Sequence, residues 1–315
     1  MSAQKVIIDC DPGQDDAVNL LLAMSSPDDI EILGITAVAG NVPLSLTERN
    51  CRIICEVAGL DDIRVFAGSA VPTVRPLVTA EHVHGNSGIN GIDVFEPDHS
   101  LESQHAVDFI IDTLHAEATD TVTLVPTGPL TNIALAFEKD PTIVPKIRRL
   151  VLMGGAMREG GNITPSAEFN IMVDPHAAAT VFACGRPITA LGLDVTHQVL
   201  TTRPRAERIR ALNNRVSAAV VGMLDFFDRY DTNKYGTQGA PLHDPCTVAW
   251  LLKPELFDGK DCNIAVETES ELTIGHTSID FWRVTDRPVN ATWIHAVDAD
   301  GFYDLLSERL GRFKD

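Results

Sequence analysis

Residues 6–17 have the sequence VIIDCDPGQDDA, which places four carboxylates within eight residues. The apolar run Val6–Ile8 is typical of a buried strand, and Pro12-Gly13 is typical of a tight turn. A helix is predicted from residue 15 onward, so the last two aspartates lie in its first turn. The stretch therefore predicts a strand, a turn and a helix, with acidic side chains gathered at the turn.

The four carboxylates belong to Asp9, Asp11, Asp15 and Asp16. Like charges this close repel one another, and neutralising all of them by raised pKa values alone is costly. A bound hard divalent cation would neutralise this repulsion at lower cost, because Ca²⁺ and Mg²⁺ bind clusters of carboxylate oxygens. We therefore expect a divalent-metal site at the carboxyl end of the first strand.

Apolar runs typical of strands alternate with segments of helical periodicity along the chain. This alternation indicates an α/β fold with an open, mostly parallel, Rossmann-like sheet and helices on both faces. Strands are expected at 5–9, 30–38, 63–67, 121–126, 148–153 and 187–193. Helices are expected at 15–25, 44–58, 104–118, 130–138, 174–184 and 214–230.

The pattern changes over residues 261–298. Short β-rich runs at Asn263–Val266 and Ala291–Ala296 suggest a hairpin added to the main sheet, followed by a last helix at 301–311. The chain shows no long linker, low-complexity tract or repeat. A single domain over residues 1–315 is expected.

Polar residues follow the predicted strands where each strand ends. In open parallel sheets, ligands bind beyond the carboxyl ends of the strands. After the first strand come Asp9 and Asp11; the later ends carry Gly40-Asn41, Pro126-Thr127-Gly128, Met153-Gly154-Gly155 and Asp194. This convergence is stronger evidence for a ligand site than any single motif.

Three further segments carry candidate site residues. His243-Asp244 precedes a predicted helix through Leu252, and Asp244 could serve there as an N-cap or as a site residue. The segment 81–88, EHVHGNSG, carries two histidines, His82 and His84, without a nearby third ligand for zinc, so a glycine-rich loop with a reactive histidine is favoured.

The third segment is 160–170, GGNITPSAEFN. Its asparagine and glutamate side chains are suited to hold sugar hydroxyls, and the alternative is an ordinary polar loop.

The net charge and composition of the chain limit the classes of ligand that the protein is expected to bind. The formal charge of −19 argues against nucleic acid and anionic membranes as ligands, and favours a neutral or cationic small molecule. No apolar stretch approaches the ~18 residues of a membrane span, and no signal pattern is evident. The six scattered cysteines are expected to be buried free thiols of a cytoplasmic protein.

The segment 9–17, DCDPGQDDA, resembles the signature of the nucleoside hydrolases, the inosine–uridine-preferring family. Further segments follow in the family's order and at similar spacing, so the resemblance covers essentially the whole chain. These segments are Val38-Ala39-Gly40-Asn41, Val83-His84-Gly85, Thr127-Gly128-Pro129-Leu130-Thr131-Asn132, Met153-Gly154-Gly155, Ala167-Glu168-Phe169-Asn170 and His243-Asp244.

The resemblance implies a Ca²⁺-dependent enzyme that hydrolyses the N-glycosidic bond of ribonucleosides to ribose and free base. It also implies a homodimer or homotetramer. The implied metal ligands are the carboxylates of Asp11, Asp16 and Asp244 and the main-chain carbonyl of Thr127. The implied ribose-binding residues are Asp15, Asn41, Met153, Asn162, Glu168 and Asn170. Asp11 would be the general base, and His243, with His84 and Tyr235 nearby, would face the leaving base.

The resemblance favours pyrimidine or mixed specificity. Purine-specific relatives stack the base between tryptophans, whereas the three tryptophans here lie outside the segments assigned to the site. Pyrimidine-preferring members often carry glutamine four residues before the tyrosine matched by Tyr235, and here that position is Asp231. The preferred base is therefore left open.

Two other functions fit parts of this pattern. A haloacid-dehalogenase-like phosphohydrolase also begins with a strand and an Asp-x-Asp motif, but here Pro12-Gly13 follows and no lysine is suitably placed for phosphate. A non-catalytic nucleoside- or ribose-binding protein could have the same pocket without turnover. Release of ribose from uridine separates binding from catalysis.

Overall fold

The computed structural model describes residues 3–235 and 239–314, and over 229–235 it describes the backbone without the side chains. A nine-stranded sheet has the order β4-β3-β2-β1-β5-β6-β7-β11-β8. All its neighbours pair in parallel except β8, which is antiparallel to β11. The strands are β1 (Gln4–Cys10), β2 (Ile30–Ala37), β3 (Val65–Ala67), β4 (Leu101–Glu102), β5 (Val122–Pro126), β6 (Ile147–Met153), β7 (Ile188–Leu191), β8 (Phe257–Cys262) and β11 (Ala291–Val297).

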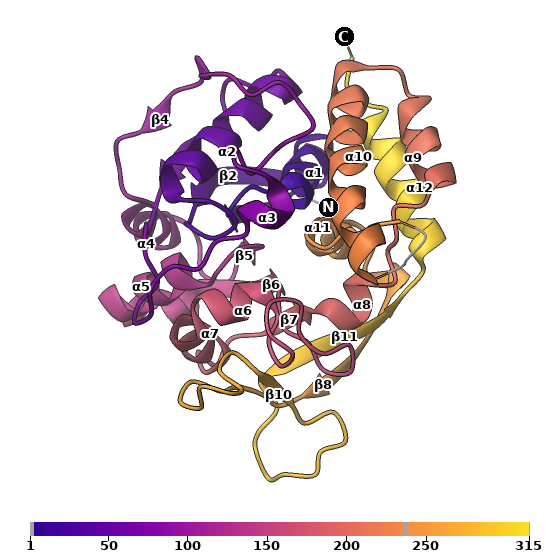
Figure 1. The fold of residues 1–315 in the computed structure, drawn as a ribbon. Helices are drawn as coiled ribbons and strands as arrows, with labels where there is room; N and C mark the ends of the chain where they lie inside the picture. Colours follow the sequence, from indigo (N-terminus) through magenta and orange to yellow (C-terminus); the bar gives the residue numbers. More distant parts are fainter. Residues whose placement is uncertain (1–2, 236–238, 315) are drawn as a thin grey trace.

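Helices cover both faces of this sheet, as the alternating pattern predicts. In Figure 1, α9, α10 and α12 lie together on one side of the molecule, and α4, α5 and α7 lie on the other. The helices are α1 (Gln14–Met24), α2 (Leu44–Ala58), α3 (Glu81–His84), α4 (Ala106–Ala116), α5 (Thr131–Lys139), α6 (Phe169–Val173), α7 (Pro175–Phe182), α8 (Leu193–Thr196), α9 (Arg203–Arg210), α10 (Arg215–Tyr235), α11 (Pro245–Leu252) and α12 (Ala299–Leu310). Short 3₁₀ helices occur at Pro141–Lys146 and Pro254–Leu256.

The alternation of side chains along β1 divides the core between the two faces. Val6, Ile8 and Cys10 pack in one apolar cluster with residues of α1, α2, α10, α11 and α12. Ile7 packs in the other cluster with residues of α4, α5 and α7. The central strands are buried on both sides, which explains why their sequences are continuous apolar runs.

The expectation for the C-terminal region is correct in part. Strand β11 joins the main sheet between β7 and β8. The predicted run Asn263–Val266 does not: β9 (Ile264–Val266) pairs with β10 (Thr277–Ile279) in a separate antiparallel sheet. The strand that pairs with β11 is β8 instead. The sequence pattern did not predict β8, because exposed polar residues occupy the middle of this strand.

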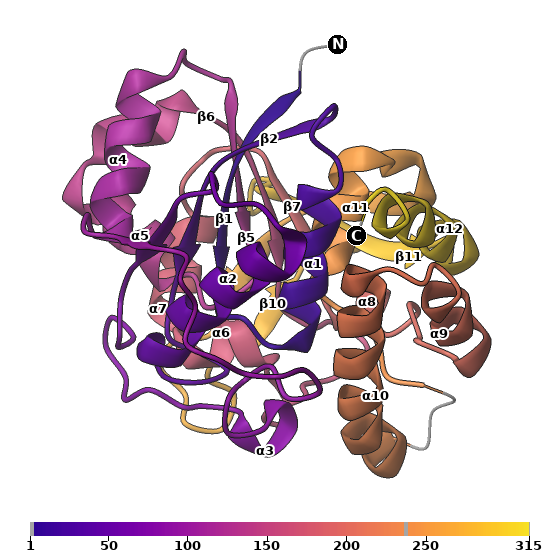
Figure 2. The same cartoon turned by 90° about the horizontal axis from the view of Figure 1, so that it is seen from above.

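The loops and helix starts at the carboxyl ends of the parallel strands gather at one end of the molecule. Helix α3 lies beside α10 there, as the two views agree (Figures 1 and 2). Among the described residues, no helix is long and apolar enough to cross a membrane.

Candidate active site

The acidic turn after β1 is held by hydrogen bonds to one of its own aspartates. Asp16 lies in the first turn of α1, and its Oδ2 accepts a hydrogen bond from the Gly13 N–H at 3.1 Å. Its Oδ1 accepts a second from the hydroxyl of Thr127, after β5, at 2.7 Å. These bonds, together with the favourable position of an acid at a helix N-terminus, fix the carboxylate in place.

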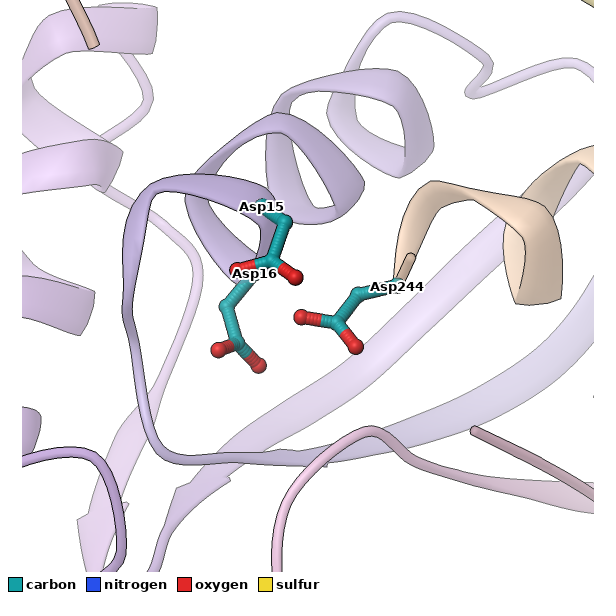
Figure 3. Close-up of side chains that lie close together, drawn as sticks. All are labelled: Asp15, Asp16 and Asp244. Carbon is teal, nitrogen blue, oxygen red and sulfur yellow. The ribbon is translucent and has the colours of Figure 1, made fainter. Parts of the chain in front are cut away.

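Asp15, Asp16 and Asp244 bring their carboxylates together from two distant parts of the chain. Each offers an oxygen atom, and these oxygens lie within 4.8 Å of one another. Figure 3 shows Asp15 and Asp16 at the start of one helix and Asp244 before another, with the three carboxylates turned toward one another. All three residues are buried.

Asp244 does not act as a helix cap. It stands at the N-cap position of α11, but its side chain makes no capping hydrogen bond. The capping interpretation of this residue is therefore wrong, and its carboxylate belongs to the acidic group.

Asp11 lies just beyond the end of β1 in a space kept open by two glycines. A Cβ atom on Gly40 would lie 2.0 Å from its Oδ2, and one on Gly128 would lie 2.6 Å from its Oδ1. Oδ2 accepts the Asn41 N–H at 2.7 Å. Oδ1 is buried and has no hydrogen-bond partner in the described part of the chain, so one oxygen remains available to a ligand.

The burial of these acids disfavours their charged forms. It raises the pKa of Asp15 to about 7 and that of Asp16 to about 6, and their mutual repulsion contributes for Asp15. The pKa values of Asp11 and Asp244 are raised well above the ordinary range by burial and by neighbouring acids. Buried oxygens without partners on Asp11 and Asp15, in a set of hard donors, fit a divalent ion such as Ca²⁺.

Asp9 does not join this group, contrary to the expectation from its spacing. It follows Ile7 in the alternation of β1, so its side chain lies on the α4 and α5 face. Its Oδ1 accepts hydrogen bonds from Thr36 at 2.6 Å and from Asn132 of α5 at 2.8 Å. The alternation does not extend to Asp11, because the strand ends at Cys10. The Asp11 side chain therefore need not lie on the same face as that of Asp9.

A cavity with an empty volume of about 710 Å³, including the solvent at its mouth, opens above the acidic group. Most of the predicted site residues line it: Asp15, Asn41, His84, Thr127, Met153, Asn162, Glu168, Asn170, His243 and Asp244. Asp11 and Asp16 are not among the lining residues. The side chain of Tyr235, at the end of α10, lies outside the described residues, as does that of Asp231.

The predicted sugar-binding residues also form hydrogen bonds with backbone groups around the cavity. The Asn170 amide donates to the carbonyl oxygens of Thr127 at 2.7 Å and of Met153 at 3.2 Å. Glu168 caps α6 and accepts from the Gly155 N–H at 3.0 Å, and burial raises its pKa to about 7. The Asn162 Oδ1 accepts from the Phe169 N–H at 2.9 Å.

Histidines also line the cavity. His84 is buried, with its Nδ1 2.7 Å from the Oε1 of Gln14 and its ring stacked on Phe227 at 5.5 Å. Burial lowers the pKa of His84 to about 3, so its ring is neutral. The Nδ1 of His243 lies 2.8 Å from the Oγ1 of Thr196.

The ring of His243 lies 5.7 Å from that of His197. Its pKa is held well below the ordinary value, by burial and then by His197 and His84.

Several lining residues were not predicted as site residues, among them His197 and Phe227. His197 lies three positions after Asp194, which follows a predicted strand. His197 is the C-cap residue of the short helix α8, which follows β7. Phe227 is buried in a helix with apolar residues at helical spacing, where the sequence alone does not distinguish a lining residue from a core residue.

The comparisons with known proteins agree with this arrangement. A family model, "Inosine-uridine preferring nucleoside hydrolase", matches residues 6–304. The chain belongs to this nucleoside hydrolase family. An uncharacterized protein of Schizosaccharomyces pombe is 51% identical over 98% of this chain and 99% of its own length.

Two relatives have names that describe their substrates. The pyrimidine-specific ribonucleoside hydrolase RihA of Shewanella baltica is 48% identical, covering 97% of this chain and 95% of that protein. The solved structure of a purine-preferring ribonucleoside hydrolase from Gardnerella vaginalis superposes with a TM-score of 0.90 at 34% identity, covering 98% of each chain.

Membership of the family makes this nucleoside hydrolase an N-glycosidase and confirms the resemblance found in the sequence. The phosphohydrolase alternative is wrong, because the family model spans nearly the whole chain.

Proposed function

We propose that this nucleoside hydrolase cleaves pyrimidine ribonucleosides to ribose and free base in a Ca²⁺-dependent reaction. The observation that carries the proposal is one cavity lined both by a buried carboxylate group and by neutral histidines. The carboxylates suit a sugar that gains positive charge, and the histidines suit a base that gains negative charge.

The residues suited to hold the ion are Asp16 and Asp244, with Asp11, the Thr127 carbonyl and Asp15 beside them. A bound Ca²⁺ would lower the pKa of a water molecule and orient the ribose hydroxyls. The Thr127 carbonyl already accepts the Asn170 amide, and its second lone pair remains for another partner.

Asp11 is the best candidate for the general base. Its unpartnered Oδ1 can take a proton from water, and its Oδ2 is held by the Asn41 N–H. The glycines on either side exclude side chains from this space. The water oxygen bonds to the anomeric carbon as the bond to the base nitrogen breaks, and a water proton balances the charge on the departing base.

The ribose would lie among Asp15, Asn41, Met153, Asn162, Glu168 and Asn170, which line the cavity next to the carboxylates. Most of these side chains are fixed by hydrogen bonds to the backbone. A sugar therefore meets groups that are already oriented, which lowers the entropic cost of binding.

The histidines that line the cavity support a role in activating the leaving base. His243 is neutral by the direction of its pKa shift, so its ring can offer a hydrogen bond from one nitrogen. The one hydrogen of the neutral His84 ring is on Nδ1, which donates to the Oε1 of Gln14, so its Nε2 is an acceptor. Pyrimidine preference is supported by the absence of tryptophan among the described lining residues and by the printed name of RihA. Tyr235 is proposed to assist on the strength of the family pattern.

The decisive test is incubation of the protein with uridine, cytidine and inosine in the presence of Ca²⁺, with free ribose measured. We expect ribose release from uridine and cytidine at least as fast as from inosine. A strong preference for inosine would overturn the pyrimidine assignment. Calorimetric binding of uridine without ribose release would establish the non-catalytic alternative instead.

A further inference from the structure

A buried hydroxyl lies directly behind the histidine that faces the proposed base site. Thr196 is the last residue of α8 and is fully buried, and its Oγ1 lies 2.8 Å from the Nδ1 of His243. We propose that Thr196 is a positioning residue: its hydroxyl donates to Nδ1 and so keeps the ring hydrogen of His243 on Nε2. The inference rests on the proposed function for its consequence in catalysis.

The direction of this hydrogen bond follows from the partners available to the hydroxyl. A threonine in a helix often donates to a carbonyl of the preceding turn, but the described contacts of Thr196 Oγ1 consist of the bond to His243 alone. The nearby carbonyl of Gly192 is occupied by the N–H groups of Val195 and Thr196. The hydroxyl hydrogen therefore has Nδ1 as its acceptor.

A ring nitrogen that accepts carries no hydrogen, so the hydrogen of the neutral His243 ring is on Nε2. His243 lines the cavity, and Nε2 is the polar atom left to face a ligand. An N–H there stabilises the oxygen of a departing pyrimidine by a hydrogen bond, without covalent chemistry. The opposite tautomer would present a lone pair to that oxygen and repel it.

Two substitutions at Thr196 separate the hydroxyl from the shape of the side chain. Thr196→Val keeps the volume and removes the donor, whereas Thr196→Ser keeps the donor. Thr123→Val is the matched control, because Thr123 is fully buried in β5 and its hydroxyl has no hydrogen-bond partner among the described residues.

The substrates are uridine and a nitrophenyl riboside, whose leaving group departs without help. We expect Thr196→Val to lower kcat/KM for uridine by about tenfold, the effect of one lost hydrogen bond, and that for the nitrophenyl riboside by less than about twofold. Thr196→Ser should restore uridine hydrolysis, and Thr123→Val should leave both rates unchanged. Equal losses on the two substrates, or no rescue by serine, would overturn the proposal.

The tautomer is measured separately by ¹⁵N NMR of histidine-labelled protein at pH 8, with the His243 signals assigned by their loss in His243→Gln. We expect the Nε2–H form in the wild type and in Thr196→Ser, and an increased Nδ1–H fraction in Thr196→Val. A wild-type ring with its hydrogen on Nδ1 refutes the proposal whatever the enzyme hydrolyses. Absence of uridine hydrolysis in the wild type would instead refute the proposed function, and the NMR result would still decide the role of Thr196.

Discussion

Asp9 and Asp11 lie two residues apart, yet their carboxylates have different surroundings. Asp9 is held by Thr36 and Asn132 on one face of the sheet. Asp11 lies beyond the strand, beside the acidic group, with one oxygen that has no partner among the described residues. At the scale of the residue, the role of each aspartate depends on the groups that its carboxylate contacts and not on its residue type.

The pair gives a matched test of the general base. Asp11→Asn should lower kcat for uridine by about 10²–10⁴-fold, because the amide cannot accept the water proton. Asp9→Asn should retain activity, since its amide oxygen can still accept from Thr36 and Asn132. Steady-state rates are measured together with the bound calcium content, so that lost metal is distinguished from lost base catalysis. Wild-type kcat in calcium-loaded Asp11→Asn would remove Asp11 from this role.

At the scale of the element, helices α11 and α12 begin in the same way in sequence but differently in structure. Asp244 and Asp298 each stand at an N-cap position. The Asp298 carboxylate accepts the Gly301 N–H at 3.0 Å, whereas Asp244 makes no capping bond. One aspartate therefore stabilises its helix, and the other faces the acidic cavity at a cost to stability.

Alanine substitutions at the two positions should separate these roles. In chelator, Asp298→Ala should lower the free energy of unfolding by about 1 kcal/mol through loss of the cap. Asp244→Ala should not lower it, because a buried like charge is removed. With Ca²⁺ added, Asp244→Ala should lose the calcium-induced rise in Tm and Asp298→Ala should keep it. Thermal unfolding with and without Ca²⁺ is the measurement, and equal destabilisation of both variants in chelator would contradict the assignment.

At the scale of the whole molecule, the buried acids couple stability to pH and to metal. Their pKa values are raised in the folded state, to about 7 for Asp15 and about 6 for Asp16. The folded protein therefore binds protons more tightly than the unfolded chain does. Without metal, the contribution of these acids to stability is greatest below the ordinary carboxyl pKa of 3.8 and is lost as pH rises through about 6 to 7.

A cation can replace these protons, so Ca²⁺ should stabilise the protein more at pH 8 than at pH 5. At a concentration 100 times the dissociation constant, the rise in Tm at pH 8 should be about 5 °C. Thermal unfolding at both pH values, with Ca²⁺ or chelator, checks the prediction. An equal rise at pH 5 and pH 8 would show that the ion does not compete with protons for these carboxylates.

The sequence by itself determined the alternation of the central parallel strands with helices, the acidic turn after β1 and most of the residues that line the cavity. These features depend on local periodicity, on turn residues and on the rule that parallel strands end at one edge of the sheet. The buried strands could also be predicted from the sequence, because a strand covered on both faces is apolar throughout.

Only the tertiary structure decided which of these residues meet. Asp244 joins Asp15 and Asp16 from more than two hundred residues away, while the neighbouring Asp9 turns to α5. His197 lines the cavity and Thr196 contacts His243, although both lie more than forty residues before it, and β9 pairs with β10 outside the main sheet. Such contacts depend on how the elements pack and in which register, and packing is a property of the whole chain that no local pattern contains.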